Sequence, residues 1–222
     1  GQGALRYNTT ASNNTAVGYQ ALYSNTTANQ NTAVGYRAGY SNTGAINSFF
    51  GDGAGYGATT GSYNTFVGVE TNYNGGGGNY NSGFGHQALR FTTGSNNTGL
   101  GYQALVFNTT GYENTAVGSV SLGNVTTGAF NAGVGRESGQ ELTTGSNNAF
   151  FGTQSGRYVT TGSNNTLIGD NAGSAMTTGT KNTILGRYNG NQGGLDIRTA
   201  SNYIVLSDGD GNPRGYFDNT GG

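Results

Sequence analysis

A short motif of alternating polar and apolar positions recurs along most of the chain. It begins with Asn, followed by Thr, Ser or Ala, a third residue that is never polar, an apolar fourth residue and a Gly. Its eleven copies are spaced 16 or 17 residues apart and begin at Asn14, Asn31, Asn47, Asn64, Asn81, Asn97, Asn114, Asn131, Asn148, Asn165 and Asn182. Such constant spacing identifies a tandem repeat, in which each copy forms one structural unit.

The period of the repeat predicts the fold. Helical repeats need about 33 residues or more and propeller blades about 40, whereas 16 or 17 residues suit one coil of a solenoid with short strands. The Gly in every copy and the abundant Thr and Asn disfavour helix. We therefore predict an all-β fold, an elongated parallel β-solenoid or β-roll of about eleven coils over residues 1–190.

The fourth motif position is apolar in every copy. Successive side chains of a strand point to opposite faces, so a constant apolar position is expected to face the interior. We predict that these residues stack into a structural core column. They are Val17, Val34, Phe50, Val67, Phe84, Leu100, Val117, Val134, Phe151, Ile168 and Leu185.

The third motif position is then expected to face outward, although none of its residues is polar. A strand that is apolar on both faces is usually buried on both, and soluble proteins rarely expose a long apolar patch. We therefore predict that identical chains pack side by side against this position. The proposed interchain face consists of Phe49, Phe66, Phe150, Leu167 and Ile184.

Three other positions carry structural predictions. The Gly at the fifth position indicates a corner or a close backbone contact. The eighth position is mostly small, which predicts a narrow core, and the Asn at the first position is expected to form an amide ladder along the stack. Thr-Thr-Gly runs, as at 109–111, 126–128 and 160–162, are expected to form corners.

Both ends of the chain depart from the full repeat. Gly1 lies 17 residues before Gly18 and so falls inside a coil, which predicts that the chain is a piece of a longer polypeptide. Residues 191–222 are expected to form a linker and a C-terminal β-hairpin, with strands at 203–206 and 214–217 around Asp-Gly turns. Asp208, Asp210 and Asn212 match the opening of a calcium loop, but no Glu follows at the required position, which favours a plain turn.

Composition narrows the classes of partner. The net charge is −1 and the nine Lys and Arg residues are scattered, which argues against binding to nucleic acid or to an anionic membrane surface. No apolar run reaches the 18 residues of a membrane span. The aromatic content of 11% and the near-zero charge argue against a disordered chain.

The residues that commonly carry catalysis are few and separated. The only His is His86, in a position that other copies fill with Tyr, so no Ser-His-Asp set can form. Asp52 and Asp170 lie seven coils apart, about 34 Å, which is too far for a glycosidase pair. The run Gly75–Gly78 opens no helix and is expected to be a loop. We predict no enzyme activity and no catalytic, cofactor or metal site.

The copies Asn14–Leu22 and Asn31–Gly39 resemble repeats in tail-fibre-like proteins of phages and in large bacterial surface proteins. They are also similar to the head repeats of trimeric autotransporter adhesins, which are shorter, so the match is to the motif and not to the period. Residues 208–219 resemble the segment that precedes an endosialidase-type intramolecular chaperone domain, which assists trimerisation and then cleaves itself off. The resemblance implies a homotrimer.

These observations together predict an extracellular structural fibre segment with a receptor-binding or adhesive role, as in a phage tail fibre or virion appendage. Variable outer residues such as Tyr19, Tyr36 and Tyr102 are candidate contacts for a cell-surface glycan. Three alternatives remain: a bacterial surface adhesin or extracellular filament, a polysaccharide-degrading fibre with an active site between chains, and an ice-binding solenoid that uses its Thr ranks.

Overall fold

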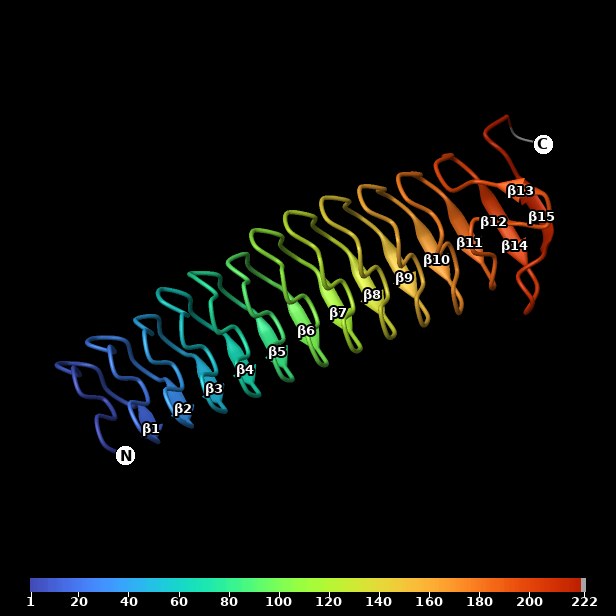
Figure 1. Cartoon of the computed structure of the whole chain (residues 1–222). Coiled ribbons are helices and arrows are strands. Elements are labelled where there is room, and N and C mark those ends of the chain that lie inside the picture. The colour runs from blue at the N-terminus through green and yellow to red at the C-terminus, as the bar shows by residue number, and fades with distance from the viewer. Residues whose placement is uncertain (221–222) are drawn as a thin grey trace.

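The computed structural model describes residues 1–220 and shows one elongated stack of coils (Figure 1). Within that range all regular elements are strands, most of them three residues long. They are β1 (Thr15–Val17), β2 (Thr32–Val34), β3 (Ser48–Phe50), β4 (Thr65–Val67), β5 (Ser82–Phe84), β6 (Thr98–Leu100), β7 (Thr115–Val117), β8 (Ala132–Val134), β9 (Ala149–Phe151), β10 (Thr166–Ile168), β11 (Thr183–Leu185), β12 (Asn191–Gln192), β13 (Leu195–Asp196), β14 (Ile204–Ser207) and β15 (Pro213–Phe217).

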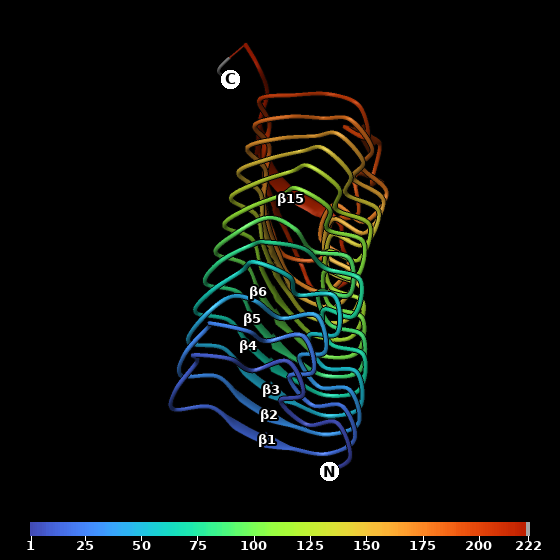
Figure 2. The same ribbon diagram turned by 90° about the vertical axis from the view of Figure 1, so that its left-hand side faces the viewer.

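Each motif supplies one strand, and consecutive strands pair in parallel. The order from β1 to β11 follows the sequence, and equivalent motif positions face one another, as in the pair Ala16 and Ala33. Viewed toward the end of the stack, the coils overlie one another and the strands form one side of it (Figure 2). The prediction of an all-β, parallel β-solenoid of about eleven turns is confirmed.

The third motif position faces the interior of the solenoid. Phe49 and Phe150 are completely buried within a single chain, and Ala33 and Val205 are as well. The assignment of this position to an interchain face was therefore wrong, because these side chains fill the coil that carries them. The five residues that lie in the interior instead of on an interchain face are Phe49, Phe66, Phe150, Leu167 and Ile184.

The fourth motif position faces outward, so the predicted core column was also wrong. Its side chains are exposed or half-buried, with 56% of Val17 and 53% of Leu185 accessible. The core is built instead from the third, eighth, ninth and twelfth positions, counted from each motif Asn. The residues that do not form the core are Val17, Val34, Phe50, Val67, Phe84, Leu100, Val117, Val134, Phe151, Ile168 and Leu185.

The third and ninth positions compensate in size in most coils. A large third residue mostly accompanies Gly at the ninth position, and Gly or Ala at the third mostly accompanies Leu. In the coils of Ala33 with Gly39 and of Gly133 with Gly139 both residues are small, and side chains of the adjacent coils fill the space. A Cβ on Gly156 would lie 2.7 Å from the Phe150 ring, and a Cβ on Gly83 would lie 3.1 Å from Leu89. The pairs are Phe49 with Gly55, Phe150 with Gly156, Leu167 with Gly173, Gly83 with Leu89, Gly99 with Leu105 and Ala116 with Leu122.

The first motif position forms the expected amide ladder. The side-chain oxygen of Asn148 accepts a hydrogen bond from the main-chain N–H of Asn165 at 3.0 Å, and its Nδ2 donates to the Gly162 carbonyl at 2.9 Å. The same acceptor contact links Asn14 to Asn31 and continues to Tyr203, whose N–H donates to Asn182 at 2.9 Å. These buried amides thus satisfy backbone groups that the corners leave unpaired.

The corners explain the invariant Gly. Gly152 has a φ of 135°, and a Cβ there would lie 2.3 Å from the Gly169 carbonyl oxygen in the next coil. Both a corner conformation and a close backbone contact therefore require Gly, as predicted. Other corners place ordinary residues in the left-handed region, including Leu122 at a φ of 48° and Gln154 at 56°.

The stack extends beyond Gly190, the boundary that the repeat indicates. A short antiparallel pair, β12 with β13, interrupts the last coil, and β14 then pairs in parallel with β11. β15 runs antiparallel to β14 at the edge of the sheet. The buried Tyr188 hydroxyl donates to the Leu195 carbonyl at 2.8 Å, and burial raises its pKa. Residues 191–207 therefore belong to the solenoid rather than to a linker.

Candidate association surface

The outward fourth positions form one continuous row, here called the outer row. Because the strands pair in register, each side chain lies beside its equivalent in the next coil, about 4.8 Å away. The row runs from Val17 on β1 to Leu185 on β11 and continues to Leu206 on β14. Every member is Val, Leu, Ile or Phe, so water faces an apolar strip along the whole sheet.

Small polar side chains flank the outer row over most of its length. The second motif position is also directed outward and is usually Thr or Ser. At the C-terminal end this position is Ile204, which pairs with Phe217 on β15, and 47% and 56% of these side chains are accessible. The apolar strip is therefore broadest at β14 and β15.

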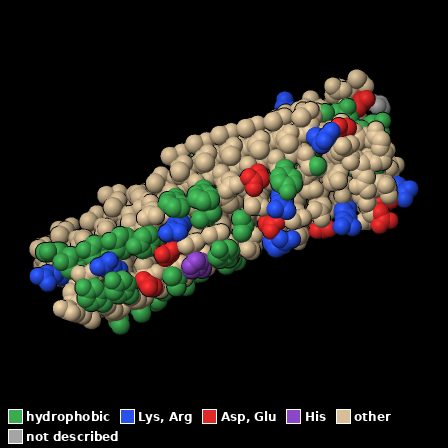
Figure 3. Space-filling model, viewed as in Figure 1, with side chains coloured by type: hydrophobic (Ala, Val, Ile, Leu, Met, Phe, Trp, Pro, Cys, Tyr) green, Lys and Arg blue, Asp and Glu red, His purple; other side chains and the backbone are tan. Residues whose placement is uncertain are grey.

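Aromatic side chains stack in columns over the N-terminal coils. Tyr23, Tyr40, Tyr56 and Tyr73 form one column with ring centres 4.7–5.0 Å apart and nearly parallel planes. The guanidinium of Arg90 continues that column over Tyr73. Figure 3 shows hydrophobic side chains in rows over this end of the molecule.

The glycan candidates from the sequence fall into two groups. Tyr19 and Tyr36 stack on each other at 5.4 Å. Tyr102 stacks on His86 at 5.6 Å, and these two residues lie four and three coils beyond Tyr36. All three tyrosines are exposed and occupy the sixth position of their coils. His86 therefore takes part in a surface stack, in agreement with its interpretation as a substitution for Tyr.

Charged side chains are more frequent over the C-terminal coils, where they pair with one another. The Glu137 carboxylate accepts a hydrogen bond from Gln154 at 2.8 Å and pairs with Arg157 at 3.2 Å and with Arg136. The bond from Gln154, together with the two guanidinium groups, lowers the pKa of Glu137 below its usual 4.5. Asp170 pairs with Arg187 at 3.3 Å.

In the candidate calcium loop, the Asp208 carboxylate accepts hydrogen bonds from other groups of the same loop. Oδ1 of Asp208 accepts hydrogen bonds from the main-chain N–H groups of Asp210 and Asn212, and Oδ2 accepts one from Arg214 at 2.8 Å. These contacts lower the pKa of Asp208. They are the contacts of a turn between β14 and β15. No group of three or more potential metal-ligating His, Asp or Glu side chains occurs within residues 1–220.

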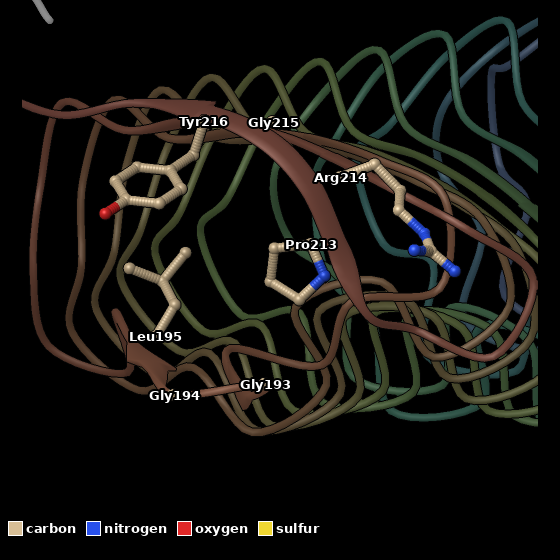
Figure 4. Close-up of a pocket in the computed structure, with 7 residues that line it drawn as sticks. All are labelled: Gly193, Gly194, Leu195, Pro213, Arg214, Gly215 and Tyr216. Carbon is tan, nitrogen blue, oxygen red and sulfur yellow. The ribbon is translucent and has the colours of Figure 1, made fainter.

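A hollow of about 330 Å³ lies at the C-terminal end, between the loop joining β12 to β13 and strand β15 (Figure 4). Leu195 and Tyr216 point toward each other across it, whereas Arg214 points away. The rest of its lining is Pro213 and Gly. Since no polar side chains converge there, this hollow offers no evident binding chemistry.

No family model, curated protein or solved structure matched the chain. In the described part of the chain, no helix has the length and apolar character needed to cross a bilayer.

The outer row was assigned to the core because alternation alone cannot tell the two faces of a strand apart. The signal that distinguishes them is the size compensation between the third and ninth positions, since only side chains that share a closed space need to compensate. The fourth position shows no such partner. This signal was present in the sequence as the recurring choice between Leu and Gly six residues after the third position.

Proposed function

We propose that this chain is a structural segment of an extracellular fibre, in which identical chains pack side by side along the outer row. The single observation that carries the proposal is the uninterrupted apolar strip on the sheet face from Val17 to Leu206. Eleven steps of about 4.8 Å make it roughly 50 Å long. A monomer rarely leaves such a strip in water, and a patch of this kind usually marks a contact with another molecule.

A second copy of the chain fits this strip better than an unrelated partner. From β1 to β11 the strip is one apolar residue wide in every coil, so a parallel neighbour meets a similar surface at each of these levels. Residues between Val and Phe in size, separated by the strand spacing, allow the side chains of adjacent chains to interdigitate. Three chains around a common axis, as the resemblance to phage fibres and trimeric adhesins implies, would shield all three rows from water.

The fibre would serve attachment, as a phage tail fibre or virion appendage that binds a receptor on a host. The columns that vary between coils, and not the conserved ladder and corner positions, would provide the binding surface. A bacterial surface adhesin is the alternative with the same architecture. The degradation of polysaccharide has no support in the surface chemistry described above, since the carboxylates of Glu137 and Asp170 are held in ion pairs.

Sedimentation equilibrium tests the proposal. The wild-type chain is expected to sediment as a trimer, and Phe151→Ser and Leu185→Ser together are expected to shift it to monomer without loss of its β circular-dichroism spectrum. Tyr158→Ser, an exposed aromatic outside the outer row, is the matched control and should leave the trimer intact. A wild-type chain that stays monomeric at high concentration would contradict the proposal.

A further inference from the structure

Two hollows lie along one side of the solenoid, away from the sheet. The first, of about 510 Å³, is lined by Phe91, Phe107, Thr109, Asn124 and Thr126. The second, of about 570 Å³, is lined by Glu141, Tyr158, Thr160, Ala175, Thr177 and Arg198. Counted from the motif Asn of each coil, most of these residues are the eleventh or the thirteenth. Corners of the coil separate these positions from the outer row. We call the two hollows together the turn-face groove.

Each hollow lies where the eleventh position changes from an aromatic to a smaller residue. Phe91 stacks on one face of the Phe107 ring at 5.7 Å with planes 12° apart, so the other face is directed toward the next coil. That coil carries Asn124, which is too short to cover the ring. Tyr158 is likewise followed by Ala175. About half of Phe107 and of Tyr158 is accessible, so the groove offers two aromatic platforms.

Hydrogen-bond acceptors lie between the two platforms. Asn124 Nδ2 donates to Glu141 Oε2 at 2.9 Å, which leaves Oδ1 of Asn124 and Oε1 of Glu141 without a hydrogen bond from within residues 1–220. Thr109 and Thr160 donate their hydroxyl protons to main-chain carbonyls of the following coils, so their oxygens can only accept. A ligand that supplies donors therefore matches these four side chains.

We propose that the turn-face groove binds a neutral oligosaccharide. A pyranose ring has an apolar C–H face that can lie on Phe107 or Tyr158, and hydroxyl groups that can donate to Asn124 and Glu141. The Glu141 carboxylate disfavours an acidic sugar, because the charge of Arg198 in the same hollow is already paired with that of Asp196. The two platforms are three coils apart, about 14 Å, so the ligand spans several sugar units.

A second copy of this chain is a poorer occupant than a glycan. The eleventh position reads Phe91, Phe107, Asn124, Glu141 and Tyr158, so, unlike the outer row, it does not repeat the same chemistry at each level. The inference extends the proposed attachment role by naming a ligand class and a site. It does not depend on self-association, because all the residues of the groove come from one chain.

Isothermal titration calorimetry with defined hexasaccharides tests the site. The probes are maltohexaose, cellohexaose, chitohexaose and a mannose hexamer, with a sialic acid hexamer as the acidic comparison. We expect at least one neutral probe to bind more tightly than the acidic one. Phe107→Ala and Tyr158→Ala should each weaken that binding roughly tenfold, because each removes a stacking platform. Asn124→Ala should weaken it less.

Tyr63→Ala is the matched control, since its ring is as exposed as that of Phe107 but belongs to another column, in which it stacks on Tyr80. It should bind as the wild type does. The inference is overturned if no neutral hexasaccharide binds, if Phe107→Ala and Tyr158→Ala both bind normally, or if the acidic probe binds best. Sedimentation of the same samples separates this outcome from a failure of the fibre proposal, because the groove variants should retain the wild-type association state.

Discussion

Neighbouring residues on every strand obey two different rules. The inward third position ranges from Gly to Phe, and its size is matched by the ninth position of the coil or by an adjacent coil. The outward fourth position is never smaller than Val and has no compensating partner. A closed interior demands constant volume, which allows exchange between positions. The outer row shows no such exchange, and this difference supports the proposal that it packs against another chain.

The difference between the two positions can be tested first by replacing each Phe of β9 by Ala in a separate variant. Phe150→Ala should destabilise the chain by about 3–5 kcal/mol, because it leaves a cavity between Leu122 and Gly156. Phe151→Ala should change the stability of the dissociated chain by less than about 1 kcal/mol. Urea unfolding at concentrations below association measures both. Equal losses would mean that the two faces of the strand are not distinct.

A compensating pair tests the volume rule directly. Gly156→Leu alone should be destabilising, because its Cβ would meet the Phe150 ring. Combined with Phe150→Ala it should recover stability, since the double variant reproduces the Ala116 and Leu122 arrangement of an earlier coil. We expect a favourable coupling of about 1–3 kcal/mol in a double-mutant cycle. Additive losses would contradict a shared interior volume.

The difference between the third and fourth positions also explains which features of the fold could be predicted from the sequence. The period, the Asn ladder and the corner Gly each follow from a local requirement, so they could be predicted. The direction of Phe49 and Phe50 could not be settled by alternation, because both are apolar and a period of two does not say which face is inside. It required the link to Gly55, six residues away, which acts through space.

The last coil escaped prediction for a different reason. Tyr203 takes the place of the ladder Asn and donates only through its main-chain N–H, so no motif marks β14. The insertion that carries β12 and β13 lengthens the step from Asn182 to 21 residues, which breaks the period. The repeat does not indicate the turn-face groove, because the groove depends on residues that differ between coils and the repeat consists of residues that the coils share.

A substitution in the Asn ladder should reduce stability less than a substitution of a large interior side chain. Asn148→Ala removes the acceptor of the Asn165 N–H and the donor to the Gly162 carbonyl, and both groups remain buried. An unsatisfied buried group costs about 1–3 kcal/mol, and water that enters the gap would reduce the loss. Thermal unfolding should show a lower midpoint for this variant than for Thr144→Ala, an exposed neighbour. Identical midpoints would show that the amide ladder adds nothing to stability.

The smallest expected effect on stability comes from the charged side chains of the C-terminal coils, which belong to neither the third nor the fourth motif position. Because the folded pKa of Glu137 lies below 4.5, its contribution is fully present above that pH and is lost as the pH falls through the lowered value. Ion pairs at the surface of a protein contribute at most about 1 kcal/mol. Glu137→Gln should therefore lower the unfolding midpoint at pH 7 but not at pH 2, whereas Glu113→Gln, at an exposed site, should match the wild type at both. A Glu137→Gln variant that differs from the wild type equally at both pH values would show that its effect comes from packing and not from charge.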